Sequence, residues 1–269
     1  MFHPGNDVAS VSNNLTLHRY KRTNKGYTED LGNGVSLMMM LIPAGEFVMG
    51  APDNELGSQD NERPQHLVKL PQFFMGCYPV TQAQWRVVAG YDRLKIDLKP
   101  APSNFKGDDL PVERVNWHQV TEFCQRLSAK SSKNYHLPSE AQWEYACRSE
   151  TDTAYHFGDQ LTEEVANYVG MVGQTTPVGQ YPVNRWGLCD MHGNVLEWCQ
   201  DYWHSNYAGA PTDGSAWLES GESGSRVCRG GSWDDVPRHC RSACRDLNVP
   251  SNISYHFGFR VCCSALRTS

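Results

Sequence analysis

Apolar residues in the first part of the chain gather into short runs that turn residues end. Val35–Ile42 is one such run, and Pro43–Gly45 closes it. A second short run, Glu46–Gly50, follows directly. Two short apolar runs joined by turn residues are typical of paired strands, so the pattern predicts a β-hairpin over residues 35–50.

Polar residues signal three helix starts. Thr81, Asn116 and Ser139 each stand three residues before a glutamine. A Ser, Thr or Asn side chain at the start of a helix can accept from a free amide of the first turn while the glutamine bonds back, which is a capping box. The pattern therefore predicts a helix after each of these three residues.

The helix predicted after Asn116 has an apolar face. The residues that recur at helical spacing are Val120, Phe123, Cys124 and Leu127. We expect this face to pack on a core, with Cys124 as a small buried hydrophobic side chain. Cys147, late in the helix predicted after Ser139, is expected to be buried in the same way.

The second half of the chain has a different pattern. From about residue 174 onward, Gly, Pro, Trp and Asn interrupt every apolar stretch within a few residues. This favours short strands and long ordered loops over helices. Residues 1–34 are polar and irregular, so we expect an N-terminal arm there, followed by one α/β (α+β) domain over residues 35–265.

Charge and composition exclude several classes of protein. The chain has 24 Lys and Arg against 30 Asp and Glu, a net charge of −6, which argues against nucleic-acid binding. No apolar run approaches the roughly 18 residues that span a bilayer, and the N-terminus lacks the pattern of a signal peptide. We expect a cytoplasmic protein that does not bind membranes and whose ten cysteines are mostly thiols.

The common catalytic motifs are missing, but one loop is rich in oxygen ligands. Gly187–Trp198 combines carboxylates, an amide and glycines in a tight stretch. Carboxylate and carbonyl oxygens are the ligands of Ca²⁺, so this segment is a candidate calcium loop. In the alternative interpretation, Asp190 and Asn194 bond only to the local backbone of a turn.

Cysteines and arginines alternate near the C-terminus. The segments concerned are Arg226–Trp233, Arg238–Arg245 and Gly258–Val261. Neighbouring arginines lower the pKa of a thiol, so these cysteines could be reactive thiolates. Alternatively, the arginines are structural and bond to loop carbonyls and carboxylates.

Taken together, these segments resemble the formylglycine-generating enzyme (sulfatase-modifying factor) family, which has a C-type-lectin-like fold. The motifs that carry the resemblance are Ile42–Gly50, Tyr78–Thr81, Pro111–Trp117, Leu137–Ala146 and Gly193–Trp198. The resemblance covers nearly the whole chain from about residue 34. It implies one C-type-lectin-like domain with short strands, few helices and much ordered loop. A shared fold is weaker evidence for a shared activity.

The resemblance also implies a test for catalysis. Enzymes of the family oxidise a substrate cysteine to formylglycine with O₂ and a copper ion held between two cysteines. Cys240 matches one of these positions, but Asp235 stands at the other. A carboxylate is a poor ligand for Cu(I), so we expect no copper. The alternative is a copper-dependent oxidase in which Cys240 works with Cys244 or Cys228.

The family further binds a structural calcium ion in the loop before its Glu-Trp motif. The matching positions here are Asp190, Gly193, Val195 and Glu197. Asp190 replaces an asparagine of the family and still supplies an oxygen. The resemblance therefore implies structural calcium at these four residues.

The C-terminal tail has an unusual composition. Residues 234–269 contain no Lys, Glu, Gln, Met or Trp, the types that codons ending in C cannot encode. Chemically arbitrary residues alternate there with residues typical of the family. The arbitrary residues are Asp234, Asp235, Val236, His239, Cys244, Asp246, Leu247, Asn248, Val249, Ile253, Ser254, Tyr255, His256 and Phe257. Each can be reached from an AAC-type codon by replacing adenines.

This tail resembles the variable region of proteins diversified by a retroelement, in which a reverse transcriptase randomises adenine-templated positions. The resemblance places the variable region at about residues 234–257. We expect a solvent-facing patch, with Leu247, Tyr255 and Phe257 among its apolar side chains, that binds an unidentified protein or other macromolecule without catalysis. A third possibility is a scaffolding module whose basic N-terminal arm docks a partner.

Overall fold

The computed structural model describes residues 21–219, 221 and 224–264, and among these no helix is long and apolar enough to cross a membrane.

The predicted N-terminal arm is wrong at its C-terminal end, because Gly26–Gly32 forms strand β1, which pairs antiparallel with β2 (Val35–Ile42). Leu31 is buried in the core. Residues 1–20 of the arm lie outside the described residues. The predicted docking of a partner by the arm depends mostly on those residues.

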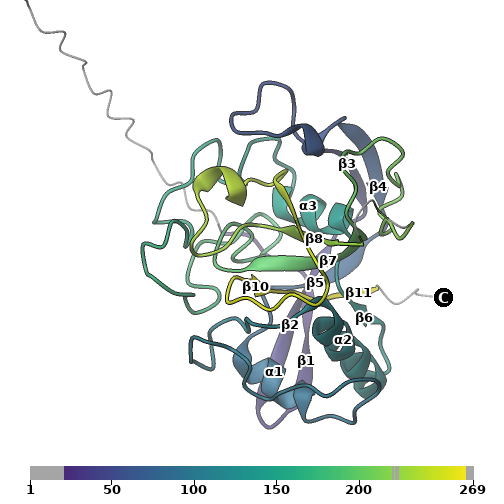
Figure 1. Ribbon diagram of the computed structural model, residues 1–269, viewed down its shortest axis with the longest axis vertical. Coiled ribbons are helices and arrows are strands. Elements are labelled where there is room, and N and C mark those ends of the chain that lie inside the picture. Colours follow the sequence, from purple (N-terminus) through teal and green to yellow (C-terminus); the bar gives the residue numbers. More distant parts are fainter. Residues whose placement is uncertain (1–20, 220, 222–223, 265–269) are drawn as a thin grey trace, which may run out of the picture.

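Strands β1 and β2 belong to a five-stranded sheet with the order β1-β2-β5-β11-β6 (Figure 1). The other strands are β5 (Phe73–Gly76), β11 (Cys262–Ser264) and β6 (Tyr135–His136). All pairings in this sheet are antiparallel. Since β11 comes from the C-terminal tail, this sheet joins the two ends of the domain.

The hairpin predicted over residues 35–50 is wrong. Strand β3 (Gly45–Met49) pairs with β4 (His66–Leu70) in a separate two-stranded sheet. Both edges of β2 are already occupied, by β1 on one side and by β5 on the other. A strand has only two hydrogen-bonding edges, so the run after Pro43 must pair elsewhere.

A four-stranded sheet with the order β10-β7-β8-β9 carries part of the predicted variable region, in β9 and β10. Its strands are β7 (Leu196–Tyr202), β8 (Arg226–Arg229), β9 (Arg245–Asn248) and β10 (Phe257–Gly258). Two 3₁₀ helices, η1 (Asp60–Glu62) and η2 (Pro237–Cys240), lie in the loops. From residue 174 on, the described part of the chain contains no α-helix, as the sequence pattern predicts.

The three predicted helices are confirmed as α1 (Gln82–Ala89), α2 (Trp117–Ser131) and α3 (Glu140–Arg148). Each follows its predicted capping residue, and in each the cap and the glutamine bond reciprocally. The predicted apolar face of α2 is buried, including Cys124, and Cys147 of α3 is buried as well.

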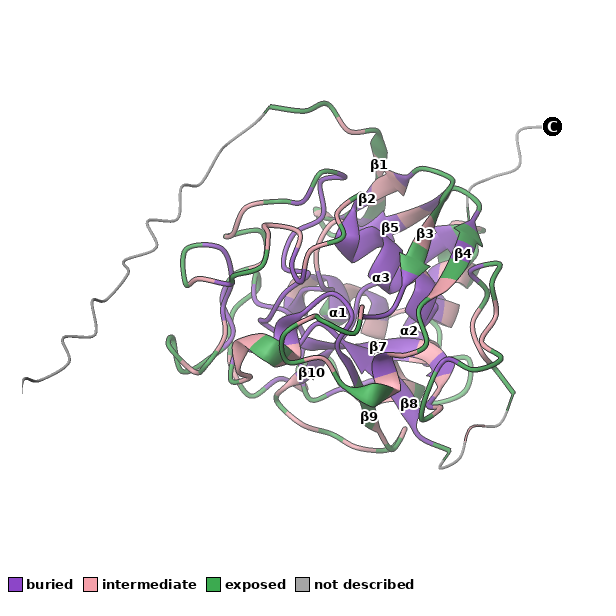
Figure 2. Ribbon diagram, turned by 90° about the horizontal axis from the view of Figure 1, so that it is seen from above, coloured by how far each residue is buried: buried purple, intermediate pink, exposed green. Residues whose placement is uncertain are grey.

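Two hydrophobic clusters divide the core. One lies against α1 and α2, where the ring of Trp85 stacks on Phe123 with 5.5 Å between centroids. The other packs α3 against the four-stranded sheet and includes Trp143, Cys199 and Val227. Figure 2 shows buried residues running through α3, β5 and β7, whereas the outer loops mix exposed and half-buried residues with some buried ones. Helix α3 is therefore the buried support of the sheet that carries the tail.

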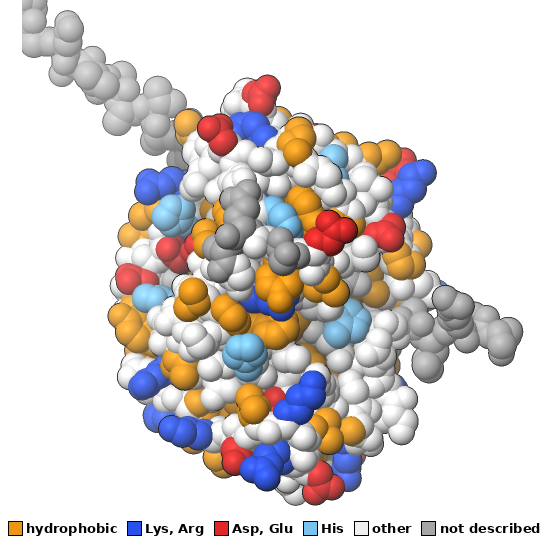
Figure 3. All heavy atoms as spheres, turned by 45° about the vertical axis from the view of Figure 1, so that its right-hand side comes forward, with side chains coloured by type: hydrophobic (Ala, Val, Ile, Leu, Met, Phe, Trp, Pro, Cys, Tyr) orange, Lys and Arg blue, Asp and Glu red, His pale blue; other side chains and the backbone are white. Residues whose placement is uncertain are grey.

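The surface mixes side-chain types. On the face drawn in Figure 3, hydrophobic and histidine side chains gather about the centre with a patch of Lys or Arg among them, and charged side chains of both signs lie toward the edge. This mixture agrees with the modest net charge of −6.

Candidate functional site

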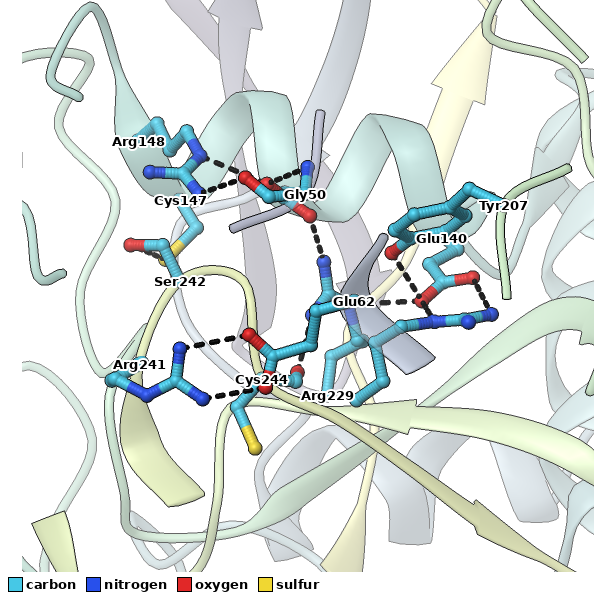
Figure 4. Close-up of polar contacts among 12 residues, drawn as sticks. Gly50, Glu62, Glu140, Cys147, Arg148, Tyr207, Arg229, Arg241, Ser242 and Cys244 are labelled. Atoms are coloured by element: carbon cyan, nitrogen blue, oxygen red, sulfur yellow. Dashed lines mark hydrogen bonds and ion pairs between the residues drawn. The ribbon is translucent and has the colours of Figure 1, made fainter. Parts of the chain in front are cut away.

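A network of buried arginines and carboxylates lies beneath the C-terminal tail (Figure 4). Arg229 of β8 donates to Glu144 of α3, and its Nε lies 3.5 Å from Oε1 of Glu140. Arg245 of β9 donates to both oxygens of Glu140, at 2.6 and 2.9 Å. Arg148 donates to Glu144 at 2.9 Å. The carboxylates of α3 thus hold two strands of the tail sheet.

A further buried ion pair fixes the loop after η2. Arg241 donates to the two oxygens of Glu62, at 2.5 and 2.8 Å, and also contacts Glu55. It donates in addition to the carbonyl of Gly57 at 3.0 Å. The buried arginines Arg229, Arg241 and Arg245 are therefore structural, as the second of the two interpretations predicts.

The interpretation of the neighbouring cysteines as reactive thiolates is wrong. Cys228, Cys240 and Cys244 are all buried. Burial raises the pKa of each of these thiols above its ordinary value. A thiol that stays protonated is a poor nucleophile, so these residues act as small core side chains.

The two positions that match the copper cysteines of the family have local structural roles. Asp235 accepts from the amide and the hydroxyl of Ser232, at 2.8 and 2.7 Å, and lies 3.3 Å from Nδ1 of His239. Cys240 packs on Gly231, where an added Cβ would come 2.6 Å from Sγ. Gly231 also has a φ of +71°, so glycine is required there on two grounds.

The predicted calcium loop contains two buried carboxylates, Asp190 and Glu197, and the guanidinium of Arg260 bonds to only one of them. Glu197 accepts from Arg260 at 2.6 and 2.7 Å and from Nε1 of Trp143 at 2.9 Å. Asp190 accepts from the amide of Gly179 at 2.7 Å through Oδ2, but its Oδ1 is buried without a hydrogen-bond partner. Burial raises the pKa of Asp190 to about 6.

This donor set fits a cation. With both carboxylates ionised, Arg260 balances one of two buried negative charges, and the free oxygen of Asp190 is available as a ligand. The carbonyl of Gly193 lies in the same turn, where it accepts from the amide of Val195 at 2.9 Å. The described residues contain no metal-binding group of three or more His, Cys, Asp or Glu side chains, so backbone oxygens would complete the site.

The alternative in which Asp190 and Asn194 bond only to their own turn is wrong. Asn194 accepts from the amide of Thr176 at 2.9 Å and donates to the carbonyl of Thr176 at 3.2 Å. Asp190 bonds to Gly179 in the same distant segment. These bonds fasten the candidate calcium loop to residues 176–179.

The predicted variable residues lie at three depths. The exposed ones are Asp234, Asp246, Leu247, Val249, Ile253 and Tyr255. The half-buried ones are Asp235, Val236, His239, Asn248, Ser254 and His256. The buried ones are Cys244 and Phe257, and for these two the prediction of a solvent-facing position is wrong.

Phe257 and Cys244 belong to the interior for clear reasons. Phe257 lies in β10, and its ring stacks on Trp198 with 4.9 Å between centroids. Each of the two is 5% exposed. Codon composition tells which residues a template can encode and carries no information on burial, so it could not separate these two from surface residues.

Several predicted variable residues meet at one cavity of about 170 Å³. Those that line it are Asp235, His239, Cys244, Asp246 and Leu247. Gln59, Asn61 and Trp203 also line it, and the sequence analysis missed them. Arg245 donates to the carbonyl of Asn61 at 2.6 Å, across 184 positions of sequence. Glu62, next to Asn61, is the signal in the sequence that could have placed this segment beside the tail. A buried arginine of the tail, here Arg241, needs a carboxylate partner.

A second group of predicted variable residues packs on aromatic side chains of the framework. The rings of Tyr255 and His256 lie 5.9 and 5.7 Å from that of Trp233, which in turn meets Phe105 at 5.5 Å. Nε2 of His256 lies 3.7 Å from a carboxylate oxygen of Asp234. This group combines aromatic and ionisable side chains at partly exposed positions.

The fold and these motifs define the class of protein. Residues 33–265 match the sulfatase-modifying factor enzyme 1-like domain, so the chain belongs to this family. The match confirms the predicted C-type-lectin-like fold class, with three α-helices among short strands and long loops in the described residues.

Relatives with known names include enzymes of two kinds. The formylglycine-generating enzyme of Bos taurus is 26% identical over 315 residues, which cover 94% of this chain and 82% of that protein. Serine/threonine-protein kinase pkn1 of Chlamydia caviae is 31% identical over 241 residues, covering 82% of this chain. The match spans 37% of that chlamydial protein, so the chain corresponds to only part of its length.

Two solved structures are similar over most of the domain. PvdO from Pseudomonas aeruginosa superposes with a TM-score of 0.79 and 34% identity, covering 91% of this chain and all of that one. Treponema denticola variable protein 1 gives a TM-score of 0.75 and 26% identity, with 91% of this chain covered. The resemblance to a variable protein that the tail indicates is thereby confirmed.

The buried arginine network yields a stability prediction. The variant Arg229→Ala leaves the buried carboxylate of Glu144 with Arg148 as its remaining arginine partner. We therefore expect the free energy of unfolding to fall by about 3–5 kcal/mol. The control is Arg86→Ala, which breaks the exposed pair with Asp108. That change should cost less than about 1 kcal/mol. Urea denaturation measures both, and equal losses would contradict a supporting role for the network.

Proposed function

We propose that this protein binds a macromolecular ligand through its diversified C-terminal tail and carries out no catalysis. The observation that carries the proposal is the cavity of about 170 Å³, where variable side chains stand on a frame of buried ion pairs. The similarity to Treponema denticola variable protein 1 supports a variable surface on this scaffold.

Strand β9 illustrates how frame and surface are separated. Arg245 is buried and bonded to Glu140, whereas the next two residues, Asp246 and Leu247, are exposed and line the cavity. The carboxylate of Asp246 accepts from the adjacent amide of Leu247 at 2.7 Å, which is a contact within the strand itself. New side chains at these two positions leave the ion pairs intact, as a diversified binding surface requires.

The cavity favours a positively charged ligand group. Asp235 and Asp246 both line it. Although Asp246 is exposed as a residue, neighbouring atoms in the cavity partly desolvate its carboxylate and raise its pKa, and the nearby Asp235 adds to the shift. Arg245 lines the cavity as well, but Glu140 already matches its charge. We therefore expect the ligand to place an amine or guanidinium there, such as a Lys or Arg side chain of a protein.

The oxidase alternative rests on the relatives that are named formylglycine-generating enzymes. Asp235 at one of the two copper positions and the buried, protonated thiol of Cys240 both argue for the non-catalytic proposal. A carboxylate with one protonated thiol is a poor site for Cu(I), so copper is not part of the proposed function.

Calcium is part of the proposal as a structural ion. Asp190, Gly193, Val195 and Glu197 would hold it through carboxylate and carbonyl oxygens. The ion would supply the positive charge that Arg260 alone does not provide. The unpartnered Oδ1 of Asp190 supports this assignment.

Binding can be tested with a random peptide library selected on the immobilised protein. Enriched peptides are expected to contain Lys or Arg, and Leu247→Ala should weaken their binding at least about tenfold through loss of apolar contact. The melting temperature should stay within about 2 °C, because Leu247 is a surface residue. The control is Leu67→Ala in β4, at 47% exposure against 38% for Leu247, which should leave binding unchanged.

The charge preference has its own readout. In Asp246→Asn the cavity loses one carboxylate, so the same selection should show a weaker enrichment of Lys and Arg. Similar losses for Leu247→Ala and Leu67→Ala, or an unchanged preference in Asp246→Asn, would contradict the proposed site.

Calcium binding predicts a shift in melting temperature that depends on pH. At pH 7, CaCl₂ should raise the melting temperature by about 2–5 °C, whereas MgCl₂ should not, and Asp190→Asn should remove the effect. The pKa of Asp190 is raised to about 6. As the pH falls through that value, a proton replaces the ion, so the calcium effect should fade between pH 7 and pH 5.

Without calcium, the stability of the protein should change with pH in the opposite direction. Ionised Asp190 is unfavourable in the fold because its pKa there lies above its ordinary value, so its protonation stabilises the protein as the pH falls through about 6. Differential scanning fluorimetry with and without CaCl₂ separates the two trends. An identical melting temperature in CaCl₂ and in buffer at pH 7 would contradict the calcium assignment.

A further inference from the structure

Two cysteines from distant parts of the chain are in contact. Cys77 follows β5, and Cys189 lies in the loop just before Asp190. Their Sγ atoms are 3.8 Å apart, across 112 positions of sequence. The amide of Cys189 donates to the carbonyl of Cys77 at 2.7 Å, so the two backbones are also held side by side. Closure of a disulfide requires this kind of approach.

The two thiols differ in exposure. Cys77 is half-buried, while Cys189 and the remaining eight cysteines are buried. Sγ of Cys77 donates to the carbonyl of Gly187 at 3.1 Å, in the loop that carries Cys189. A reagent from solution can therefore reach Cys77 first, and Cys189 lies within reach of whatever forms there.

We propose that Cys77 and Cys189 form a dithiol modification site that exchanges with a small-molecule disulfide of the oxidised glutathione class. This site is independent of the ligand-binding function proposed above. It requires the two sulfurs to approach from 3.8 Å to about 2.05 Å, which side-chain rotation can provide because the backbones are already hydrogen-bonded.

The exchange has two steps. First, the thiolate of Cys77 attacks one sulfur of the small disulfide, giving a mixed disulfide and releasing one small thiol. Then Sγ of Cys189 attacks Sγ of Cys77, forming the bridge and releasing the second small thiol. The two protons of the cysteines end on the two released thiols, so the protein loses two electrons and the small disulfide gains them.

The bridge would act on the candidate calcium loop. Cys189 precedes Asp190 directly, and Gly187 and Cys189 both contact Cys77 at the end of β5. A covalent link at this point fixes the start of the loop that runs to Glu197. Bridges in a reducing compartment are usually reversible, so the site would report the redox state of its surroundings.

Native incubation of the full chain with oxidised glutathione tests the proposal. Intact mass spectrometry should show the loss of two hydrogen atoms, and peptide mapping should find Cys77 joined to Cys189. The variant Cys189→Ser should stop at one glutathione adduct on Cys77, because the resolving thiol is gone. The matched variant Cys77→Ser should keep its original mass.

Three outcomes would overturn the proposal. They are an unchanged mass of the original chain, a glutathione adduct on Cys77 that never resolves although Cys189 is present, and a bridge between other cysteines under native conditions. The original chain alone decides each of these, so the test holds even where a serine variant fails to fold. Ligand binding is not measured in this experiment, and its result leaves the proposed function untouched.

Discussion

Neutralisation of buried guanidinium groups supports the C-terminal half of the domain. Removing a charge from water costs several kcal/mol, so an arginine is stable in the interior only where carboxylates and carbonyls satisfy it. Helix α3 supplies Glu140 and Glu144 to Arg229 and Arg245, and its own position follows from the capping box at Ser139. The capping box thus sets where α3 begins and so where its two carboxylates lie. These carboxylates in turn hold Arg229 and Arg245 and the strands that carry them.

Under the proposed function, this separation of frame and cavity would let one scaffold present many surfaces. The frame uses side chains that point inward and have several partners each, such as Arg241 with Glu62. The cavity uses Asp246, Leu247 and His239, which make few contacts with the frame. A set of catalytic residues that touch the substrate would not survive exchange of its members, whereas a binding surface needs only its supporting frame to persist.

Sequence signals predicted the structure where the cause is local. The capping boxes located the three α-helices of the described residues, and the Gly- and Trp-rich pattern anticipated the short strands of the tail. The hairpin after β2 failed because strand partners depend on distant segments, and β5 takes the edge. The depth of Phe257 and the contribution of Asn61 to the cavity also depend on long-range packing, which no local pattern encodes.

The most direct measurement of the central claim is urea unfolding of a triple variant in which His239, Asp246 and Leu247 are all replaced by alanine. If the buried ion pairs alone support the tail, the free energy of unfolding should fall by less than about 2 kcal/mol for the three changes together. A fall of about 3–5 kcal/mol, as expected for the loss of one buried arginine, would show that the cavity residues are themselves part of the frame.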